Sequence, residues 1–124
     1  MTKKPHEIKE RTFCFALDTI KICLEIDKRE KFQVLTKQLM RSASSVGANV
    51  REARNAESKN DFIHKLSVAL KECDETNYWI SLLIELTETK RENLERLLTE
   101  SDEIMRVLSS IILKSKANSN WKKR

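Results

Sequence analysis

The sequence predicts an all-α protein, an antiparallel up-down-up-down four-helix bundle that occupies the whole chain, 1–124, as one domain. The 124 residues include one glycine and one proline, too few for the turns of a typical sheet protein. Apolar residues recur at helical spacing in four segments, and short charged stretches separate these segments. The hydrophobic content of 40% is too high for a disordered chain, although 35% of the residues are charged.

The first helix is expected over residues 6–27. Its apolar residues, among them Phe15, Ile22 and Ile26, occupy more than half of the helix circumference on a helical wheel. A helix that buries one face needs an apolar stripe of only about a third of that circumference. We therefore expect this helix to be covered on two sides, either at the centre of the bundle or at an interface between subunits. Cys14 falls outside the apolar arc and is expected to be exposed.

The second helix is expected over residues 32–56, after a charged turn. Its middle, 42–48, is built almost entirely of small residues and includes Gly47, the only glycine. A glycine in a helix interior costs about 1 kcal/mol relative to alanine. We interpret the segment as a place where another helix approaches closely enough to offset that cost. A kink at Gly47 is the alternative.

The third helix is expected over residues 59–88, after Ser58, which has the position and chemistry of an N-cap residue. One apolar stripe of this helix faces the core. A second stripe points away from the first and would be bare in a monomer, namely Val68, Trp79, Leu82 and Leu86. Exposed apolar surface of this kind often marks an interaction site, so the stripe predicts an oligomer interface. The fourth helix, over 93–114, has one narrow apolar face and closes the bundle.

Polar side chains gather beside the apolar seam of the second helix: Arg41, Ser42, Ser45, Asn49 and Glu52. Arg41 and Glu52 lie three turns apart and cannot pair with each other. The expected partner of Arg41 is Glu72 or Glu75 on the third helix. We interpret these residues together as a structural network that fixes the register of the helices, provided that each member finds a partner. A functional site is the alternative interpretation.

The net charge of +5 lies at the end of the chain, in a basic tail over 115–124 and the residue before it. Five of the 24 basic residues are found there, namely Lys114, Lys116, Lys122, Lys123 and Arg124. The other 19 basic residues equal the acidic residues in number, so the rest of the chain has no net charge. Such a segment can bind the phosphates of nucleic acid. We predict that it does so together with Arg51 and Arg54 of the second helix. A tail that only improves solubility is the alternative.

No pattern typical of catalysis or metal binding is found. The two histidines, His6 and His64, stand apart from any cysteine or acid at metal-ligand spacing. Gly47 stands alone, so no glycine-rich loop can hold a phosphate. Glu72 and Glu75 share a helix face, but general acid–base catalysis would need a partner and a pocket that the sequence does not show. We expect no enzyme activity, no metal and no cofactor.

The sequence predicts a cytoplasmic protein that does not enter a membrane. No signal peptide is found at the N-terminus, and no apolar run approaches the ~20 residues needed to span a bilayer. The three cysteines are an odd number and include no CxxC pair, which favours reduced thiols over a disulfide framework. Cys23 and Cys73 are expected to fill core positions.

Two segments resemble the bacterial four-helix bundle family encoded within 23S ribosomal RNA intervening sequences. They are 39–53, LMRSASSVGANVREA, and 57–79, ESKNDFIHKLSVALKECDETNYW. The resemblance extends across essentially the whole chain. It implies a bundle that assembles into a ring-like homo-oligomer, most commonly a homopentamer. The family also includes the accessory variability protein of diversity-generating retroelements, a basic barrel that binds nucleic acid and a reverse transcriptase.

The function expected from the resemblance and the basic tail is that of a non-catalytic homo-oligomer associated with nucleic acid, structured RNA above all. The partners would be further copies of the chain together with RNA or DNA. The alternative is a protein–protein interaction scaffold with no role in nucleic-acid binding. Its surface would be the second stripe of the third helix and the outer face of the oligomer.

Overall fold

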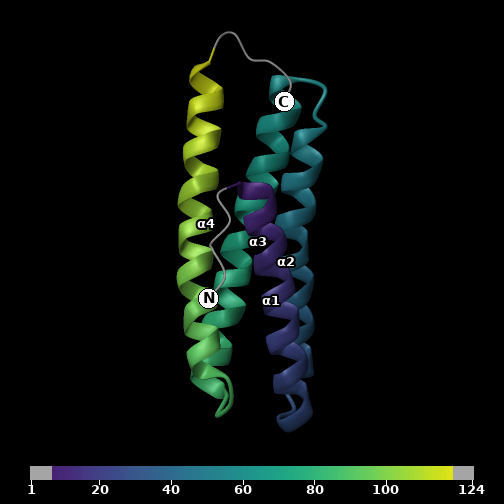
Figure 1. Ribbon diagram of the computed structural model, residues 1–124, viewed down its shortest axis with the longest axis vertical. Helices are drawn as coiled ribbons and strands as arrows, with labels where there is room; N and C mark the ends of the chain where they lie inside the picture. The colour runs from purple at the N-terminus through teal and green to yellow at the C-terminus, as the bar shows by residue number, and fades with distance from the viewer. Residues whose placement is uncertain (1–6, 119–124) are drawn as a thin grey trace.

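The computed structural model describes residues 7–118, which form four α-helices and no strand. The helices are α1 (Ile8–Arg29), α2 (Gln33–Arg54), α3 (Lys59–Leu86) and α4 (Arg91–Ala117). They lie side by side as an elongated bundle, in which α1 begins part of the way along the others (Figure 1). The prediction of an all-α chain with four helices is confirmed.

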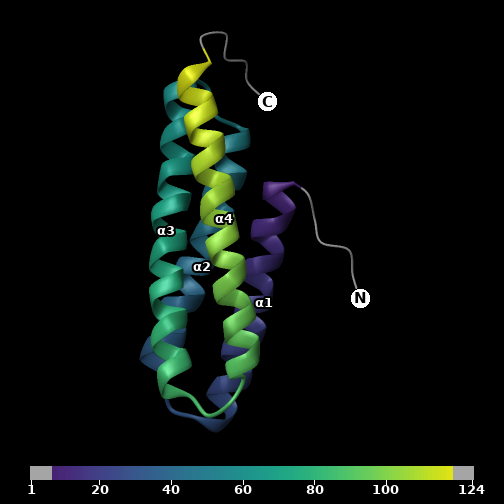
Figure 2. The same ribbon diagram turned by 90° about the vertical axis from the view of Figure 1, so that its left-hand side faces the viewer.

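Each helix has two neighbours in the bundle. Contacts join α1 to α2, α2 to α3, α3 to α4 and α4 to α1, whereas no Cα atoms of the diagonal pairs approach within 8 Å in the described part of the chain. Figure 2 shows this order, with α4 between α3 and α1 and with α2 behind them. The α1–α2 side and the α3–α4 side are therefore opposite faces of the bundle.

The ends of the helices lie at most three residues from the expected positions. The third helix begins as predicted, because Ser58 Oγ accepts a hydrogen bond of 3.0 Å from the main-chain N–H of Asp61. It ends at Leu86, two residues early. The next residue, Thr87, has an extended backbone, and its hydroxyl binds the carboxylate of Glu30. The fourth helix begins two residues early, at Arg91, and runs to Ala117. No glycine or proline lies there to end it.

The lysine that starts α3 meets the end of α4. Lys59 Nζ donates to the main-chain carbonyl oxygens of Lys116 at 3.2 Å and Asn118 at 2.8 Å. The last carbonyls of a helix have no partner within the helix, and a cation is favourable near them. This contact satisfies carbonyl groups at the end of α4 and ties that end to the start of α3.

Gly47 lies where α1 and α2 approach each other closely. The helix α2 continues through it without interruption. A Cβ atom at this position would lie 3.4 Å from the main-chain carbonyl oxygen of Thr12 on α1. The small residues of α2 thus serve close packing, and the helix is not broken at Gly47. Cys23 and Cys73 lie in the core with no exposed surface, as expected.

The helix α1 does not lie at the centre of the bundle, which was one of the two positions expected for it. It packs only against α2 and α4, and Phe15, Cys23 and Ile26 form its buried face. Part of its wide apolar arc remains exposed in the isolated chain, because no helix covers the side that carries Phe13 and Leu24. Packing within the bundle therefore accounts for only part of the apolar arc of α1.

Candidate functional site

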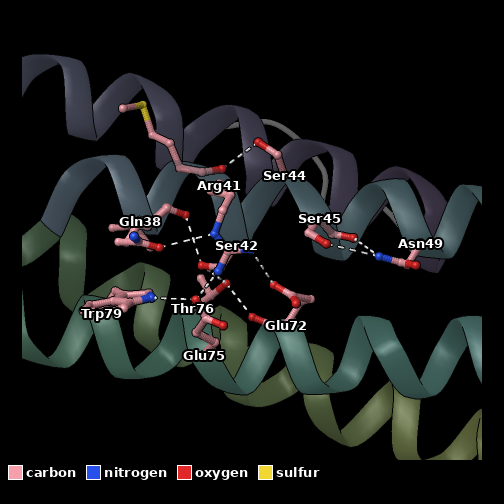
Figure 3. A network of polar contacts seen from close by, with 12 residues as sticks. Gln38, Arg41, Ser42, Ser44, Ser45, Asn49, Glu72, Glu75, Thr76 and Trp79 are labelled. Carbon is pink, nitrogen blue, oxygen red and sulfur yellow. Dashed lines mark hydrogen bonds and ion pairs between the residues drawn. The ribbon is translucent and has the colours of Figure 1, made fainter. Parts of the chain in front are cut away.

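Arg41 connects α2 to α3 through two glutamates (Figure 3). Its guanidinium donates to Glu72 Oε1 at 3.2 Å and forms a second, shorter ion pair with Glu75. Its Nε donates to Gln38 Oε1 at 3.3 Å on its own helix. Both partners considered from the sequence are used, and each lies on α3 directly opposite Arg41.

The carboxylate of Glu75 has two donors. Besides Arg41, the indole Nε1–H of Trp79 donates to it at 3.0 Å. The bond from Trp79, and then the charge and hydrogen bond of Arg41, hold the pKa of Glu75 below its ordinary value. The same ion pair raises the pKa of Arg41. Both groups therefore stay charged at neutral pH, and Glu75 lacks the raised pKa that a general acid needs.

A buried pair of hydroxyl groups lies beneath this ion pair. Ser42 and Thr76 have no exposed surface, and their hydroxyl oxygens lie 2.8 Å apart across the α2–α3 interface. Thr76 Oγ1 also lies 2.8 Å from the main-chain carbonyl oxygen of Glu72. Each hydroxyl also has a main-chain carbonyl oxygen of its own helix within hydrogen-bond distance. The bond between Ser42 and Thr76 is therefore an additional link, and it favours this position of α2 along α3.

The remaining polar residues of α2 lie outside this cluster. Asn49 Nδ2 donates to Ser45 within the same helix, at 2.9 Å to the main-chain oxygen and 3.1 Å to Oγ. Glu52 forms an ion pair of 2.9 Å with Lys65 of α3. The structure thus joins α2 to α3 at two separate heights, and Ser45 and Asn49 take no part in either link.

The described basic residues of the predicted nucleic-acid site are all exposed. Arg51 and Arg54 lie at the end of α2, and Lys114 and Lys116 lie at the end of α4. The ends of these two helices lie at the same end of the bundle (Figure 1). Arg54 has a distant acidic neighbour, Glu7 at 4.0 Å. The other three form no ion pair with any described residue. The last three basic residues, Lys122, Lys123 and Arg124, lie outside the described residues.

The second stripe of α3 is less bare than expected. Leu86 is 50% exposed, but Val68, Trp79 and Leu82 are half-buried in the isolated chain. Trp79 packs against the hydrophobic core and uses its N–H in the bond to Glu75. The stripe therefore offers little apolar surface to a partner, and the largest exposed side chains lie elsewhere.

Two polar links were not anticipated from the sequence. On the α1–α4 side, Arg11 binds Glu100 and Glu103. At the end of the bundle away from the basic residues, Glu30 accepts from the main-chain N–H groups of Glu88 at 3.1 Å and Thr89 at 3.2 Å. Each link joins residues more than 50 positions apart, so no local sequence pattern marks it.

The described residues show no ready site for a metal ion. They contain no cluster of three His, Cys, Asp or Glu side chains that could hold one. None of the helices in 7–118 has the length and apolar character needed to cross a bilayer.

These features define a class of protein, a four-helix chain whose helices are tied together by polar side chains on facing positions. The chain belongs to the family of 23S rRNA-intervening sequence proteins, which matches residues 4–110. The resemblance seen in the sequence is thereby confirmed. Comparison with curated proteins gives no match.

A solved structure is similar to this chain over nearly all of its length. It is a crystal structure of a protein of unknown function from the S23 ribosomal protein family, from Bacteroides thetaiotaomicron. The two sequences are 42% identical, and the alignment covers 86% of this chain and 98% of the other, with a TM-score of 0.81. At this identity the likeness extends to the family as well as to the fold.

Proposed function

We propose that this chain is a non-catalytic, self-associating, antiparallel four-helix bundle that binds nucleic acid, structured RNA above all, in the cytoplasm. The observation that supports the proposal is the basic end of the bundle, defined here as Arg51, Arg54, Lys114 and Lys116. These side chains come from two helices, are exposed and lie at one end of the molecule.

The chemistry of the basic end suits phosphate binding without sequence selection. Arg51, Lys114 and Lys116 have no ion-pair partner among the described residues, so they can contact phosphates without first breaking a bond. Side chains of this kind position a protein on nucleic acid and do not read its bases. Lys122, Lys123 and Arg124 follow α4 in the sequence and would add to the same contacts.

The test is the salt dependence of binding to a structured RNA and to duplex DNA. A triple variant, R51A/K114A/K116A, removes three charges from the basic end. A matched control, R29A/K31A/K37A, removes one arginine and two lysines that are exposed near the other end of the bundle. Each lost phosphate contact lowers the slope of log K against log salt by about one. We expect the first variant to lose about three from the slope and the control to lose much less.

Two results would contradict the proposal. One is equal weakening by the two triple variants, because the charge would then act through the net charge of the protein alone. The other is the absence of binding at low salt. A further variant, K122A/K123A/R124A, separates the contribution of the tail from that of the basic end.

A second candidate function is a protein-interaction scaffold with no role in nucleic-acid binding. It is favoured by a different observation, the exposed side chains of Phe13, Leu17 and Leu24 on α1. A protein partner would be retained on the immobilised chain after nuclease treatment and at high salt, whereas a complex held through RNA would be lost.

A further inference from the structure

In the described part of the chain, three helices instead of four reach the basic end of the bundle. The helix α1 begins at Ile8, part of the way along the others, so α2, α3 and α4 continue beyond it (Figure 1). Glu7, the residue before α1, already has an extended backbone. The faces of α2 and α4 that pack against α1 farther along the bundle are therefore not covered by a helix at this end.

An apolar groove of about 320 Å³ lies where α1 stops. All four helices contribute to its apolar lining, which consists of Ile8, Val50, Ala53, Phe62, Leu66 and Ile111. Ile8, Phe62 and Ile111 are only half-buried, although each packs against the core. A concave site with apolar walls favours the binding of another apolar group. We define it as the end groove.

The mouth of the end groove is charged. Glu7 and Lys9 line it from the start of α1, and Arg54 lines it from the end of α2. Glu7 Oε2 lies 4.0 Å from Arg54 Nη1, and the two side chains are 68% and 49% exposed. An occupant that carries an apolar group next to basic residues fits this arrangement, because its apolar group enters the groove and its cations lie near Glu7.

The chain itself contains such an occupant directly after α4. Residues 119–124 have the sequence SNWKKR, in which one tryptophan precedes three basic residues. Residues 1–6, at the other end of the chain, contain no Phe, Trp or Tyr. A packed tryptophan buries on the order of 150–250 Å², and its N–H usually finds a hydrogen-bond acceptor. Trp121 is therefore the residue of the tail that gains most from an apolar groove.

The tail is long enough to reach the end groove. Ile111 precedes Asn118 by about two turns of helix, which is roughly 10 Å along α4. Trp121 follows Asn118 by three residues, and three residues of extended chain also span roughly 10 Å. The main-chain N–H of Asn118 still donates to Lys114 O at 3.1 Å, so the tail starts from the end of a helix and has only to turn back.

We infer that Trp121 binds in the end groove and anchors the tail of the same chain to the basic end of the bundle. Glu7 offsets part of the repulsion between the tail and Arg54. Arg54 lies at the mouth of the groove, so it stays accessible to a phosphate beside the bound indole. None of the other basic-end residues, Arg51, Lys114 and Lys116, lines the groove.

The docking needs no nucleic acid, but its consequence rests on the function proposed above. An anchored tail holds Lys122, Lys123 and Arg124 close to the basic end. The two sets of cations then form one continuous surface for phosphates. Each set raises the effective concentration of the other for the same ligand.

Tryptophan fluorescence measures the docking without nucleic acid. The chain has two tryptophans, so Trp79→Phe leaves Trp121 as the only indole, and circular dichroism checks that this variant keeps its helices. The reference is a free peptide of residues 117–124. We expect Trp121 in the protein to emit at a shorter wavelength than the peptide and to be quenched severalfold less by acrylamide. Emission and quenching equal to those of the peptide overturn the inference.

Two variants of the end groove, each combined with Trp79→Phe, test where Trp121 binds. Ile111→Glu places a charge on the α4 side, and Ile8→Glu places one at the first position of α1, where a carboxylate favours the helix. Leu98→Glu is the matched control, because Leu98 is also half-buried on α4 but lies outside the groove. Both groove variants should give the emission of the free peptide, and the control should not. If folded groove variants keep Trp121 protected, the end groove is not its site.

Dilution distinguishes the tail of the same chain from the tail of a second copy. Protection within one chain does not depend on protein concentration, whereas a tail bound to another copy is released on dilution. Loss of protection on dilution therefore overturns docking within the chain. Emission that equals that of the peptide until RNA is added also overturns it, because Trp121 would then stack on bases.

RNA binding tests the consequence separately. Trp121→Ala removes no charge, yet it should weaken binding to a structured RNA severalfold because the tail is released. K122A/K123A/R124A should then cost less affinity in the Trp121→Ala background than in the wild type. Additive losses would show that the tail and the basic end act independently, which contradicts the continuous surface. The absence of RNA binding at low salt contradicts the proposed function and leaves the fluorescence result unaffected.

Discussion

Arg11 on α1 and Glu100 on α4 form a two-point ion pair, with Arg11 Nε 2.7 Å from Oε2 and its second nitrogen 2.8 Å from Oε1. The side chain of Arg11 is 13% exposed, and Glu103 is also within 3.2 Å. The hydrogen bond to Glu100 raises the pKa of Arg11, so the guanidinium keeps its charge. This pair is the main polar link on the α1–α4 side, where the two helices pack least extensively.

The first prediction is that Arg11→Met lowers the free energy of unfolding by about 2 kcal/mol, because two partly buried carboxylates then lose their cation. Urea denaturation followed by circular dichroism measures the change. The double variant Arg11→Met/Glu100→Met should recover part of the loss, since it removes one of the carboxylates left without a cation. The single variant Glu100→Met completes the comparison. If the losses of stability in Arg11→Met and Glu100→Met simply added up to the loss in the double variant, Arg11 and Glu100 would not interact in solution.

The second prediction concerns acid stability and the carboxylate of Glu30. Hydrogen bonds from the hydroxyls of Thr87 and Thr89 and from two main-chain N–H groups lower the pKa of Glu30 to about 2. The folded pKa lies below the unfolded value of about 4.3. The stabilisation is therefore fully present above the unfolded pKa and is lost as the pH falls through the folded value.

A comparison of the wild type with Glu30→Gln between pH 7 and pH 2 tests this interpretation. Glu30→Gln should be less stable at pH 7, and the difference from the wild type should shrink as the pH falls from about 4.5 towards 2. Glu85→Gln, an exposed carboxylate near the end of α3, is the control. Parallel stability curves for Glu30→Gln and the wild type would show that the hydrogen bonds to Glu30 do not persist in solution.

The third prediction is that the cysteines differ sharply in reactivity. Cys14 is exposed, whereas Cys23 and Cys73 are buried. Burial raises the pKa of each buried thiol to about 12, so neither forms a thiolate near neutral pH. A thiol reagent at pH 8 should modify one cysteine quickly and the other two only at the rate at which the chain opens. Rapid labelling of all three without denaturant would contradict the close packing of the core.

The fourth prediction separates close packing from helix propensity at Gly47. A methyl group there would be at the limit of ordinary contact with the carbonyl oxygen of Thr12, and alanine favours the helix by about 1 kcal/mol. Gly47→Ala should therefore leave the stability unchanged or raise it by up to about 1 kcal/mol. Gly47→Leu should lower it by more than 1 kcal/mol because α1 must move away. Equal effects of alanine and leucine in urea denaturation would show that α1 does not approach α2 here.

The four helices could be predicted because the signals that mark a helix lie within the helix itself or within a few residues of its ends. Apolar spacing marks each helix, and Ser58 marks the start of α3 through a bond to Asp61 only three residues away. Arg41 could also be assigned partners, because α2 and α3 are consecutive helices joined by a short turn. The sequence therefore predicted the helices, the start of α3 and the contacts between consecutive helices.

The remaining links depend on which helix faces which. Arg11 and Glu100 are 89 residues apart, and their pairing follows only once α1 is known to pack against α4. Trp79 was expected on the surface because its position on the helical wheel points away from the core stripe. Its large ring nevertheless reaches the core, and its N–H binds Glu75. A helical wheel gives the direction of a side chain but neither its length nor its hydrogen bonds.

The contact between Lys59 and the end of α4 has a consequence for the basic end. Lys59 Nζ donates to the main-chain oxygens of Lys116 and Asn118, so the last turn of α4 is anchored to the first residue of α3. Lys114 and Lys116 therefore stand on a fixed helical turn. A phosphate-bearing ligand that contacted them would not have to order this part of the chain first, and the entropic cost of binding would be lower.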